Sequence, residues 1–178
     1  DLGSVVREAV EAFESQAREA GLTLTLSLPG GPIPLEGDPV RLAQMLSNVL
    51  SNACKYTERG GAVALAVECS DGEVTVSVRD TGAGIPPEKL DEIFEIFTQV
   101  DRTVERSQGG LGIGLTLVKR LAQMHGGDVT ARSAGLGQGS EPARPYVARP
   151  SRAGRDVEHR RRIDPDRRPR RRHHGVAG

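Results

Sequence analysis

Four short segments between residues 48 and 115 constrain the fold of this chain more than any other feature of its sequence. The first holds two asparagines and a lysine, the second an aspartate and two glycines, the third two phenylalanines and the fourth four glycines. Each segment alone is common, but four in one order at these spacings are hard to obtain by accident. The segments are Asn48–Thr57, Asp80–Ile85, Phe94–Phe97 and Gly109–Leu115.

Apolar spacing predicts a helix, a strand and a second helix before the first segment ends. Residues 2–20 repeat apolar side chains at helical spacing up to Gly21, and residues 22–28 alternate leucine with polar residues as a half-buried strand does. Asp38 and Pro39 then open a long amphipathic helix, as an N-cap residue and a proline at the first helical position.

Two further strands are predicted at 62–69 and 73–80, joined by the hairpin signal Ser70-Asp71-Gly72. The valines of the second strand share one face, and a period of two places Asp80 on that inward face. A carboxylate at an inward position needs a partner.

The remaining pattern predicts a short helix from Pro86-Pro87 through Phe97, a polar loop at 98–110, a helix over 115–125 and a strand over 128–133. His125, before two glycines, is interpreted as a helix C-cap rather than a catalytic group. This order of elements predicts a two-layer α/β sandwich, with one mixed sheet and helices packed on one face.

Charge divides the chain at about residue 141. Residues 1–141 hold 12 basic and 20 acidic residues, a net charge of −8, with enough apolar residues for a core. Residues 142–178 hold 12 arginines, no lysine, four acids and five prolines, a net charge of +8. We therefore expect one domain over 1–141 and an Arg/Pro-rich tail over 142–178 that is disordered.

Several classes of function are disfavoured by what the sequence lacks. Cys54 and Cys69 stand in no metal-ligand spacing and are interpreted as small core residues. No apolar run approaches the roughly 18 residues of a membrane span, and no signal peptide is visible, so we expect a cytoplasmic domain without membrane contact. No folded basic motif accompanies the tail, so nucleic acid is not an expected partner.

The first segment has the chemistry of a metal and phosphate site. Asn48 and Asn52 lie four residues apart and Lys55 follows, which places all three on one helix face. Amide oxygen is a hard ligand that suits Mg²⁺ where phosphates already supply negative charge. The alternative is an ordinary solvated helix face.

The second segment combines a carboxylate with a collapsible backbone. Asp80 can accept a hydrogen bond from the exocyclic amine of adenine, and guanine presents a carbonyl at that place. Gly82 and Gly84 let a base approach the main chain. The alternative is a simple Asp-Thr-Gly turn.

The glycines of the fourth segment precede a helix, where exposed backbone N–H groups and the helix dipole favour phosphate. A Rossmann site would need a strand immediately before them, and a polar loop stands there instead. The Walker pattern also fails, because no Lys-Ser or Lys-Thr pair follows.

Together the four segments resemble the N, G1, F and G2 boxes of the ATP-binding catalytic domain of sensor histidine kinases, a branch of the GHKL ATPases. The resemblance covers roughly residues 1–140. It implies a Bergerat-type fold, ATP and Mg²⁺ as cofactors, and transfer of the γ-phosphoryl group to a histidine on a separate dimerisation domain. It also implies a response regulator receiver domain as a partner in two-component signalling.

The resemblance assigns roles to individual residues. Asn52 would hold Mg²⁺, and Asn52, Lys55 and Arg106 would be the catalytic residues. Residues 98–108 are similar to the ATP lid, in which Arg102 and Gln108 would also contact phosphate. For Phe94 and Phe97, plain core or lid-hinge packing is an equal alternative to a role in the F box, and the two interpretations are compatible. The nucleotide-binding residues implied are Asn48, Asn52, Lys55, Tyr56, Asp80, Gly82, Gly84, Ile85, Phe97, Arg102, Gln108, Gly110, Leu111, Gly112, Gly114 and Leu115.

The sequence departs from this family after Ser140. Related domains continue with an aromatic residue and an alternating strand, whereas Pro142 and an Arg/Pro/Ala mixture follow here. The segment is either the product of a shifted reading frame or a genuine basic tail. Without a last strand the sheet would have an exposed edge. None of the four histidines stands in a phosphoacceptor motif, so a catalytic fragment is expected.

Two other interpretations stay open at this point. One is another GHKL ATPase, Hsp90-, gyrase- or MutL-like, against which Lys55-Tyr56-Thr57 and the phenylalanine segment argue. The other is a non-catalytic interaction module, against which the intact Asn52 and Asp80 argue.

Overall fold

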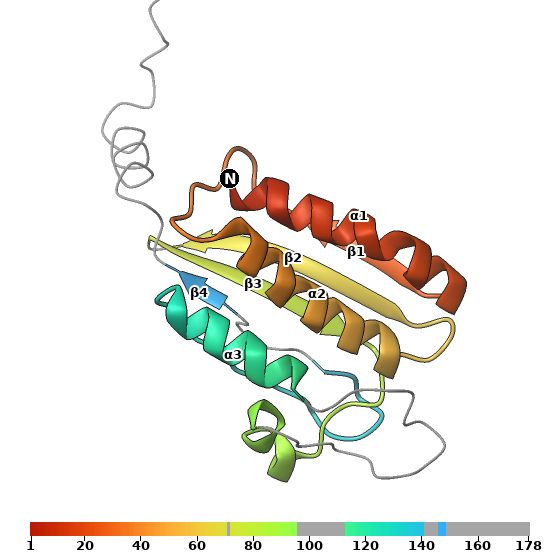
Figure 1. The fold of residues 1–178 in the computed structure, drawn as a ribbon. Helices are drawn as coiled ribbons and strands as arrows, with labels where there is room; N and C mark the ends of the chain where they lie inside the picture. The colour runs from red at the N-terminus through yellow and green to blue at the C-terminus, as the bar shows by residue number, and fades with distance from the viewer. Residues whose placement is uncertain (71, 96–112, 141–145, 149–178) are drawn as a thin grey trace, which may run out of the picture.

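The computed structural model describes residues 1–70, 72–95 and 113–140, together with the backbone of 146–148. These residues form one mixed sheet with three helices on one of its faces (Figure 1). The predicted two-layer α/β sandwich is therefore confirmed.

The sheet has the strand order β1-β2-β3-β4. β1 (Thr23–Ser27) runs parallel to β2 (Ala62–Ser70), and β3 (Glu73–Asp80) runs antiparallel to β2. β4 (Tyr146–Ala148) is antiparallel to β3, opposite Val74–Val76. The alternating valines of β2 and β3 are buried and Asp80 is buried with them, so its predicted inward position is confirmed.

α1 (Leu2–Ala20) is capped at both ends by local chemistry. The Asp1 carboxylate accepts hydrogen bonds from the backbone N–H groups of Gly3 at 3.3 Å and Ile33 at 2.8 Å. At the other end Gly21 adopts the left-handed conformation, with φ 71°. The predicted stop at Gly21 is thus confirmed.

α2 (Pro39–Tyr56) begins at the predicted N-cap, because Asp38 Oδ1 accepts from the N–H groups of Val40 at 2.8 Å and Arg41 at 3.3 Å. One stripe of the helix is buried over the sheet. Its members are Leu42, Met45, Leu46, Val49, Leu50, Ala53 and Cys54. This stripe fixes which side chains of α2 remain near solvent.

α3 (Gly114–Met124) packs beside α2 (Figure 1). Its buried side chains are Val118, Leu121 and Ala122. It ends at His125, as predicted, and Gly126 turns the chain away with φ 73°. α3 thus brings Gly114, the last glycine of the fourth segment, next to Asn48 of α2.

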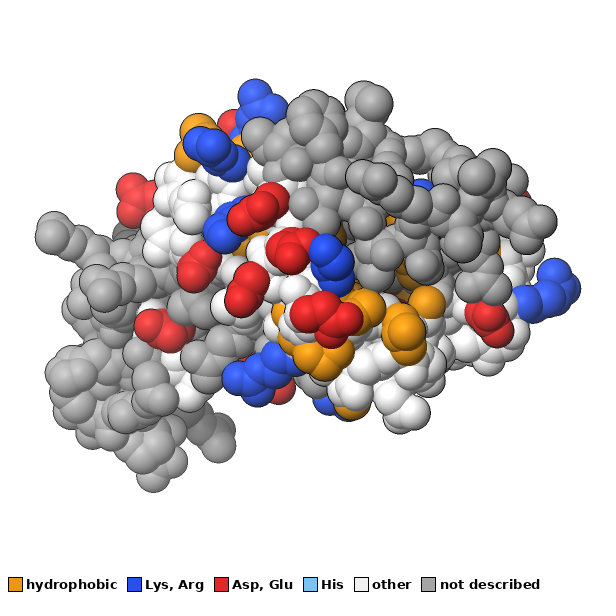
Figure 2. All heavy atoms as spheres, turned by 90° about the horizontal axis from the view of Figure 1, so that it is seen from below, with side chains coloured by type: hydrophobic (Ala, Val, Ile, Leu, Met, Phe, Trp, Pro, Cys, Tyr) orange, Lys and Arg blue, Asp and Glu red, His pale blue; other side chains and the backbone are white. Residues whose placement is uncertain are grey.

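The segment between β3 and α3 differs from the predicted helix. Residues 86–95 contain two 3₁₀ turns, η1 (Pro87–Lys89) and η2 (Glu92–Phe94), and Glu95 is already extended. Tertiary packing decides this, since Ile93 and Phe94 are buried in the core while their neighbours are not. Figure 2 views the molecule from below, the end where these turns lie in Figure 1, and shows acidic and basic side chains interspersed on this face.

The predicted strand over 128–133 does not form. Arg132 makes a single bridge, and Val129 is buried without belonging to a ladder. A strand needs a free edge to pair with. The edge of β3 is occupied by β4 and by the bridge between Asp80 and Ser140.

β4 lies inside the segment 142–178, which composition assigned to a tail. The edge of β3 is therefore paired opposite Val74–Val76, where we expected an exposed edge. The domain boundary at 141 stays a prediction.

The two cysteines differ in environment. Cys54 is buried on α2, and burial raises the pKa of its thiol, as expected for a core residue. Cys69 is exposed, so its assignment to the core was wrong: the last residues of β2 extend beyond the part of the strand that is buried. No helix of the described residues is long and apolar enough to cross a membrane.

Candidate nucleotide-binding site

Three parts of the fold meet at the second segment: the C-terminal end of α2, the loop that follows β3 and the loop over 133–140. The start of α3 lies beside α2 at Asn48. The loop after β3 joins α2 through a hydrogen bond from Ala83 N to Tyr56 O of 3.0 Å. It joins the 133–140 loop through Gly137 N to Ala83 O, 2.8 Å, and Gly139 N to Gly82 O, 3.1 Å.

Asp80 lies at the floor of this junction with only 8% of its surface exposed. Its Oδ1 accepts from Gly82 N at 2.9 Å and from Ser140 N at 3.2 Å, and its Oδ2 accepts from the Ser140 hydroxyl. These donors hold the buried carboxylate in one orientation and compensate its desolvation.

Gly82 and Gly84 permit close approaches of one backbone to another. A Cβ on Gly82 would lie 2.3 Å from Tyr56 O, and one on Gly84 would lie 2.1 Å from Gly135 O. Gly84 also has a φ of 72°. The groups that approach these glycines in the structure are thus carbonyls of this chain, where the sequence suggested a base.

Ile85 continues the loop. Its N–H donates to Ser133 Oγ at 2.9 Å, and that hydroxyl donates to Gly139 O at 2.7 Å. The Ile85 side chain packs against the core from the edge of the site. Ser133 therefore ties the loop after β3 to the 133–140 loop.

Sequence reasoning missed the part that Ser133 and Ser140 play. The available signal was Gly137-Gln138-Gly139-Ser140, which was interpreted only as the last stretch before the tail. Gly139 has a φ of 72°, and a Cβ there would lie 2.2 Å from Asp80 O. That glycine lets Ser140 reach the carboxylate.

The predicted polar face of α2 runs through Asn48, Asn52 and Lys55. The side-chain N–H of Asn48 donates to Gln44 O at 2.9 Å, and Asn48 Oδ1 faces Gly114, where a Cβ would come within 3.2 Å. Asn52 is partly exposed, and its side-chain amide has no hydrogen-bond partner among the described residues. Lys55 is exposed with its Nζ 5.2 Å from the ring centroid of Tyr56.

The start of α3 faces this side of α2. The residue at the N-cap, Ile113, offers no side-chain acceptor, so within the described residues the first turn of α3 has no side-chain cap. The hydroxyl of Thr116 is buried and has no hydrogen-bond partner in the part of the chain that the structure describes. Leu115 packs against the core and fixes the helix there.

The lid prediction lies outside the described residues. So do the roles expected for Phe97, Arg102, Arg106, Gln108, Gly110, Leu111 and Gly112. Phe94 is a core residue, 7% exposed, with Lys119 Nζ 5.7 Å from its ring centroid.

These features define a two-layer α/β domain with a polar junction at the end of α2, and comparison with known proteins identifies its family. The family of histidine kinase-, DNA gyrase B-, and HSP90-like ATPases matches residues 37–147, so the chain belongs to this family. It is 38% identical over 141 residues to the circadian input-output histidine kinase CikA of Synechococcus elongatus. That match covers 78% of this chain and 19% of CikA, so the chain spans about a fifth of this relative.

Solved structures of histidine kinases share the fold. The catalytic domain of ThkA superposes with a TM-score of 0.68 at 26% identity, over 79% of this chain and 89% of that chain. Full-length ShkA in complex with AMPPNP gives a TM-score of 0.70 at 35% identity, over 85% of this chain and 31% of that chain. A further structure shows ThkA with the response regulator TrrA. The chain thus contains an ATP-binding catalytic domain of the histidine kinase type rather than of the gyrase or Hsp90 type.

Proposed function

We propose that this chain binds Mg-ATP and, as the catalytic domain of a sensor histidine kinase, donates the γ-phosphoryl group to a histidine on a dimerisation domain. The single observation that supports this most is Asp80, a buried carboxylate held by Ser140 and Gly82 at the end of β3. A buried carboxylate whose orientation is fixed by such donors can present its remaining acceptor capacity to a ligand in one defined direction.

Asp80 is suited to recognise adenine. Its Oδ1 already accepts two backbone hydrogen bonds, whereas Oδ2 accepts only from the Ser140 hydroxyl among the described residues. A carboxylate oxygen can accept two hydrogen bonds, so Oδ2 can accept one more, from an exocyclic amine. Guanine has no donor at that position, and ATP should therefore bind more tightly than GTP.

We assign the part of the site that would bind the phosphates of ATP to α2 and α3. The amide of Asn52, which has no hydrogen-bond partner among the described residues, fits a Mg²⁺ ligand, because Mg²⁺ prefers hard oxygen donors and takes few from the protein. Bound Mg²⁺ would supply charge neutralisation for the phosphates. The start of α3 at Gly114 and the exposed Lys55 and Tyr56 would orient them, with Arg102, Arg106 and Gln108 of the lid segment.

The partners follow from this assignment. The chain spans about a fifth of CikA, so the phosphoacceptor histidine is expected on another domain of a longer kinase. A response regulator receiver domain is the expected final acceptor, since the similar ThkA forms a complex with TrrA. Such a domain would act in the cytoplasm.

Substitution of Asp80 tests the proposal. Asp80→Asn keeps the shape but replaces one acceptor oxygen with a donor, so ATP binding should weaken by about 1.5–3 kcal/mol. Calorimetric titration with ATP and GTP should also show a smaller preference for ATP. The matched control is Asp91→Asn, an exposed carboxylate on the η1–η2 segment, which should bind as the parent does.

Transfer to a supplied dimerisation domain gives a second readout. Acid-labile phosphate should appear on that domain with the parent chain and fall with Asp80→Asn at subsaturating ATP. Unchanged ATP affinity in Asp80→Asn would make Asp80 a turn residue and place adenine recognition elsewhere.

A further inference from the structure

His125 lies at the C-terminal end of α3 and contacts two elements that are far apart in sequence. Its backbone N–H donates to Ala122 O at 3.1 Å and Leu121 O at 3.2 Å, and its Nδ1 lies 2.8 Å from Leu121 O. On the other side of the ring, the backbone N–H of Asp38 donates to Nε2 at 3.1 Å. Asp38 is the N-cap residue of α2, 87 residues away.

These two contacts determine where the imidazole carries its proton. A backbone N–H can only donate and a backbone carbonyl can only accept. Nε2 is therefore the unprotonated acceptor from Asp38, and Nδ1 is protonated and donates to Leu121 O. The two contacts together require the neutral ring with its proton on Nδ1.

The chain entering α2 is shaped to fit this ring. A Cβ on Gly37 would lie 2.8 Å from Cδ2 and 3.4 Å from Nε2 of His125. Any residue other than glycine at position 37 would thus displace the imidazole or the chain. Gly37 thus packs against the imidazole ring, and Asp38 donates a hydrogen bond to it.

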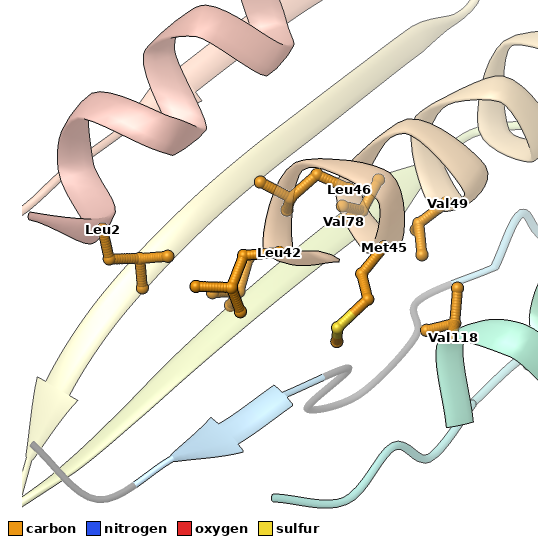
Figure 3. A pocket seen from close by; sticks show the side chains of 8 residues that line it. Leu2, Leu42, Met45, Leu46, Val49, Val78 and Val118 are labelled. Carbon is orange, nitrogen blue, oxygen red and sulfur yellow. The ribbon is translucent and has the colours of Figure 1, made fainter. Parts of the chain in front are cut away.

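α2 and α3 run side by side in opposite directions and touch at two polar points. At one end His125 meets Asp38, and toward the other end Asn48 Oδ1 faces Gly114. A small apolar cavity of about 20 Å³ lies between these points, among side chains of α1, α2, β3 and α3 (Figure 3). Its lining residues are Leu2, Leu42, Met45, Leu46, Val49, Val76, Val78 and Val118.

We propose that His125 is a positioning residue whose Nδ1-protonated ring ties the end of α3 to the start of α2. The hydrogen bond from Asp38 N to His125 Nε2 fixes the end of α3 against the start of α2. This contact sets the relative position of the two helices, and with it the placement of Gly114 and the first turn of α3 opposite Asn48. Its effect on ATP rests on the proposed function above.

Nuclear magnetic resonance tests the tie directly on the full chain without nucleotide. Two-bond ¹H–¹⁵N spectra of the imidazole at neutral pH should show His125 with a protonated Nδ1 and a bare Nε2. A ring protonated on Nε2 would overturn the proposal. This measurement does not depend on ATP, so a chain that binds no ATP would refute the proposed function and leave this test intact.

Two variants distinguish the hydrogen bond between Asp38 and His125 from the role of His125 in capping α3. Asn at position 125 keeps an amide near the place of Nδ1 but does not reach Asp38, whereas Gln can present its amide oxygen near the place of Nε2. His125→Asn should bind Mg-ATP roughly three- to tenfold more weakly, the scale of one hydrogen bond, and His125→Gln should remain within about twofold of the parent. Circular dichroism at the titration temperature establishes that each variant is folded.

Gln123→Ala is the matched control, because Gln123 is exposed on the same turn and its side chain makes no hydrogen bond within the described residues. Parent-like ATP affinity in His125→Asn, or equal losses in the Asn and Gln variants, would overturn the tie. If His125→Asn does not fold, the NMR measurement on the parent alone tests the proposal: a proton on Nδ1 supports it, and a proton on Nε2 overturns it.

Discussion

Single side chains in this domain carry distinct parts of the proposed site. Asp80 is held rigidly by Ser140 and Gly82, whereas the Asn52 amide has no hydrogen-bond partner among the described residues. The difference matches their proposed tasks. A group that recognises a base benefits from fixed geometry, and a group that binds a hydrated cation must offer a free oxygen.

Removing the amide of Asn52 should therefore abolish the increase in ATP affinity that Mg²⁺ gives. We expect the parent to bind Mg-ATP with a Kd on the order of 10–100 μM, or about −5.5 to −7 kcal/mol. Asn52→Ala should bind ATP equally with and without Mg²⁺ in calorimetric titrations. Ser51→Ala, an exposed neighbour on the same helix, should keep the Mg²⁺ dependence. If the parent bound ATP equally with and without Mg²⁺, the assignment of Asn52 as a Mg²⁺ ligand would be wrong.

Among the elements, the loop after β3 depends most on close backbone contacts. It passes under the end of α2, where Tyr56 O accepts from Ala83 N and comes so near Gly82 that no side chain fits between them. A methyl group at this position must push the loop away from α2, and Asp80 with it.

Gly82→Ala should accordingly destabilise the domain by about 1–3 kcal/mol, the usual cost of overpacking. Gly30→Ala is its control, since no atom lies within 4 Å of a Cβ there and its φ is not positive. Urea unfolding of both variants checks the difference. Equal midpoints would mean that the loop moves at little cost and that the glycine is not needed for packing.

For the whole molecule, the edge of the sheet depends on residues after Ser140. β4 pairs with β3 opposite Val74–Val76, although its sequence belongs to the basic segment and follows two prolines. Whether that segment is native or out of frame, its three strand residues complete the edge of β3.

A chain ending at Ala148 should therefore be more stable than one ending at Ser140, by about 1–3 kcal/mol for a few lost backbone hydrogen bonds. Thermal unfolding of the two truncated chains gives the comparison, and ATP titration gives the control. Both should bind ATP with similar affinity where both are folded, because the proposed nucleotide contacts all precede position 116. Equal unfolding temperatures would show that β4 adds nothing to the domain.

Local chemistry alone determined much of this protein. Periodicity predicted α1, α2, α3 and the inward position of Asp80, and cap residues predicted the starts and stops at Asp38, Gly21 and His125. These features succeed because helical spacing, strand alternation and capping involve residues only a few positions apart. The four segments also indicated the family correctly, since their order along the chain reflects one shared site.

Other features became clear only from the tertiary structure, because they depend on which distant segment pairs with a sheet edge or packs into the core. The edge of β3 is taken by Ser140 and β4, which leaves residues 128–133 without a ladder. Burial of Ile93 and Phe94 gives 3₁₀ turns in place of a helix. Ser140 reaches Asp80 across 60 positions, and His125 reaches Asp38 across 87. No local pattern specifies such pairs, because their free energy comes from burial and hydrogen bonds that exist only once the chain has closed on itself.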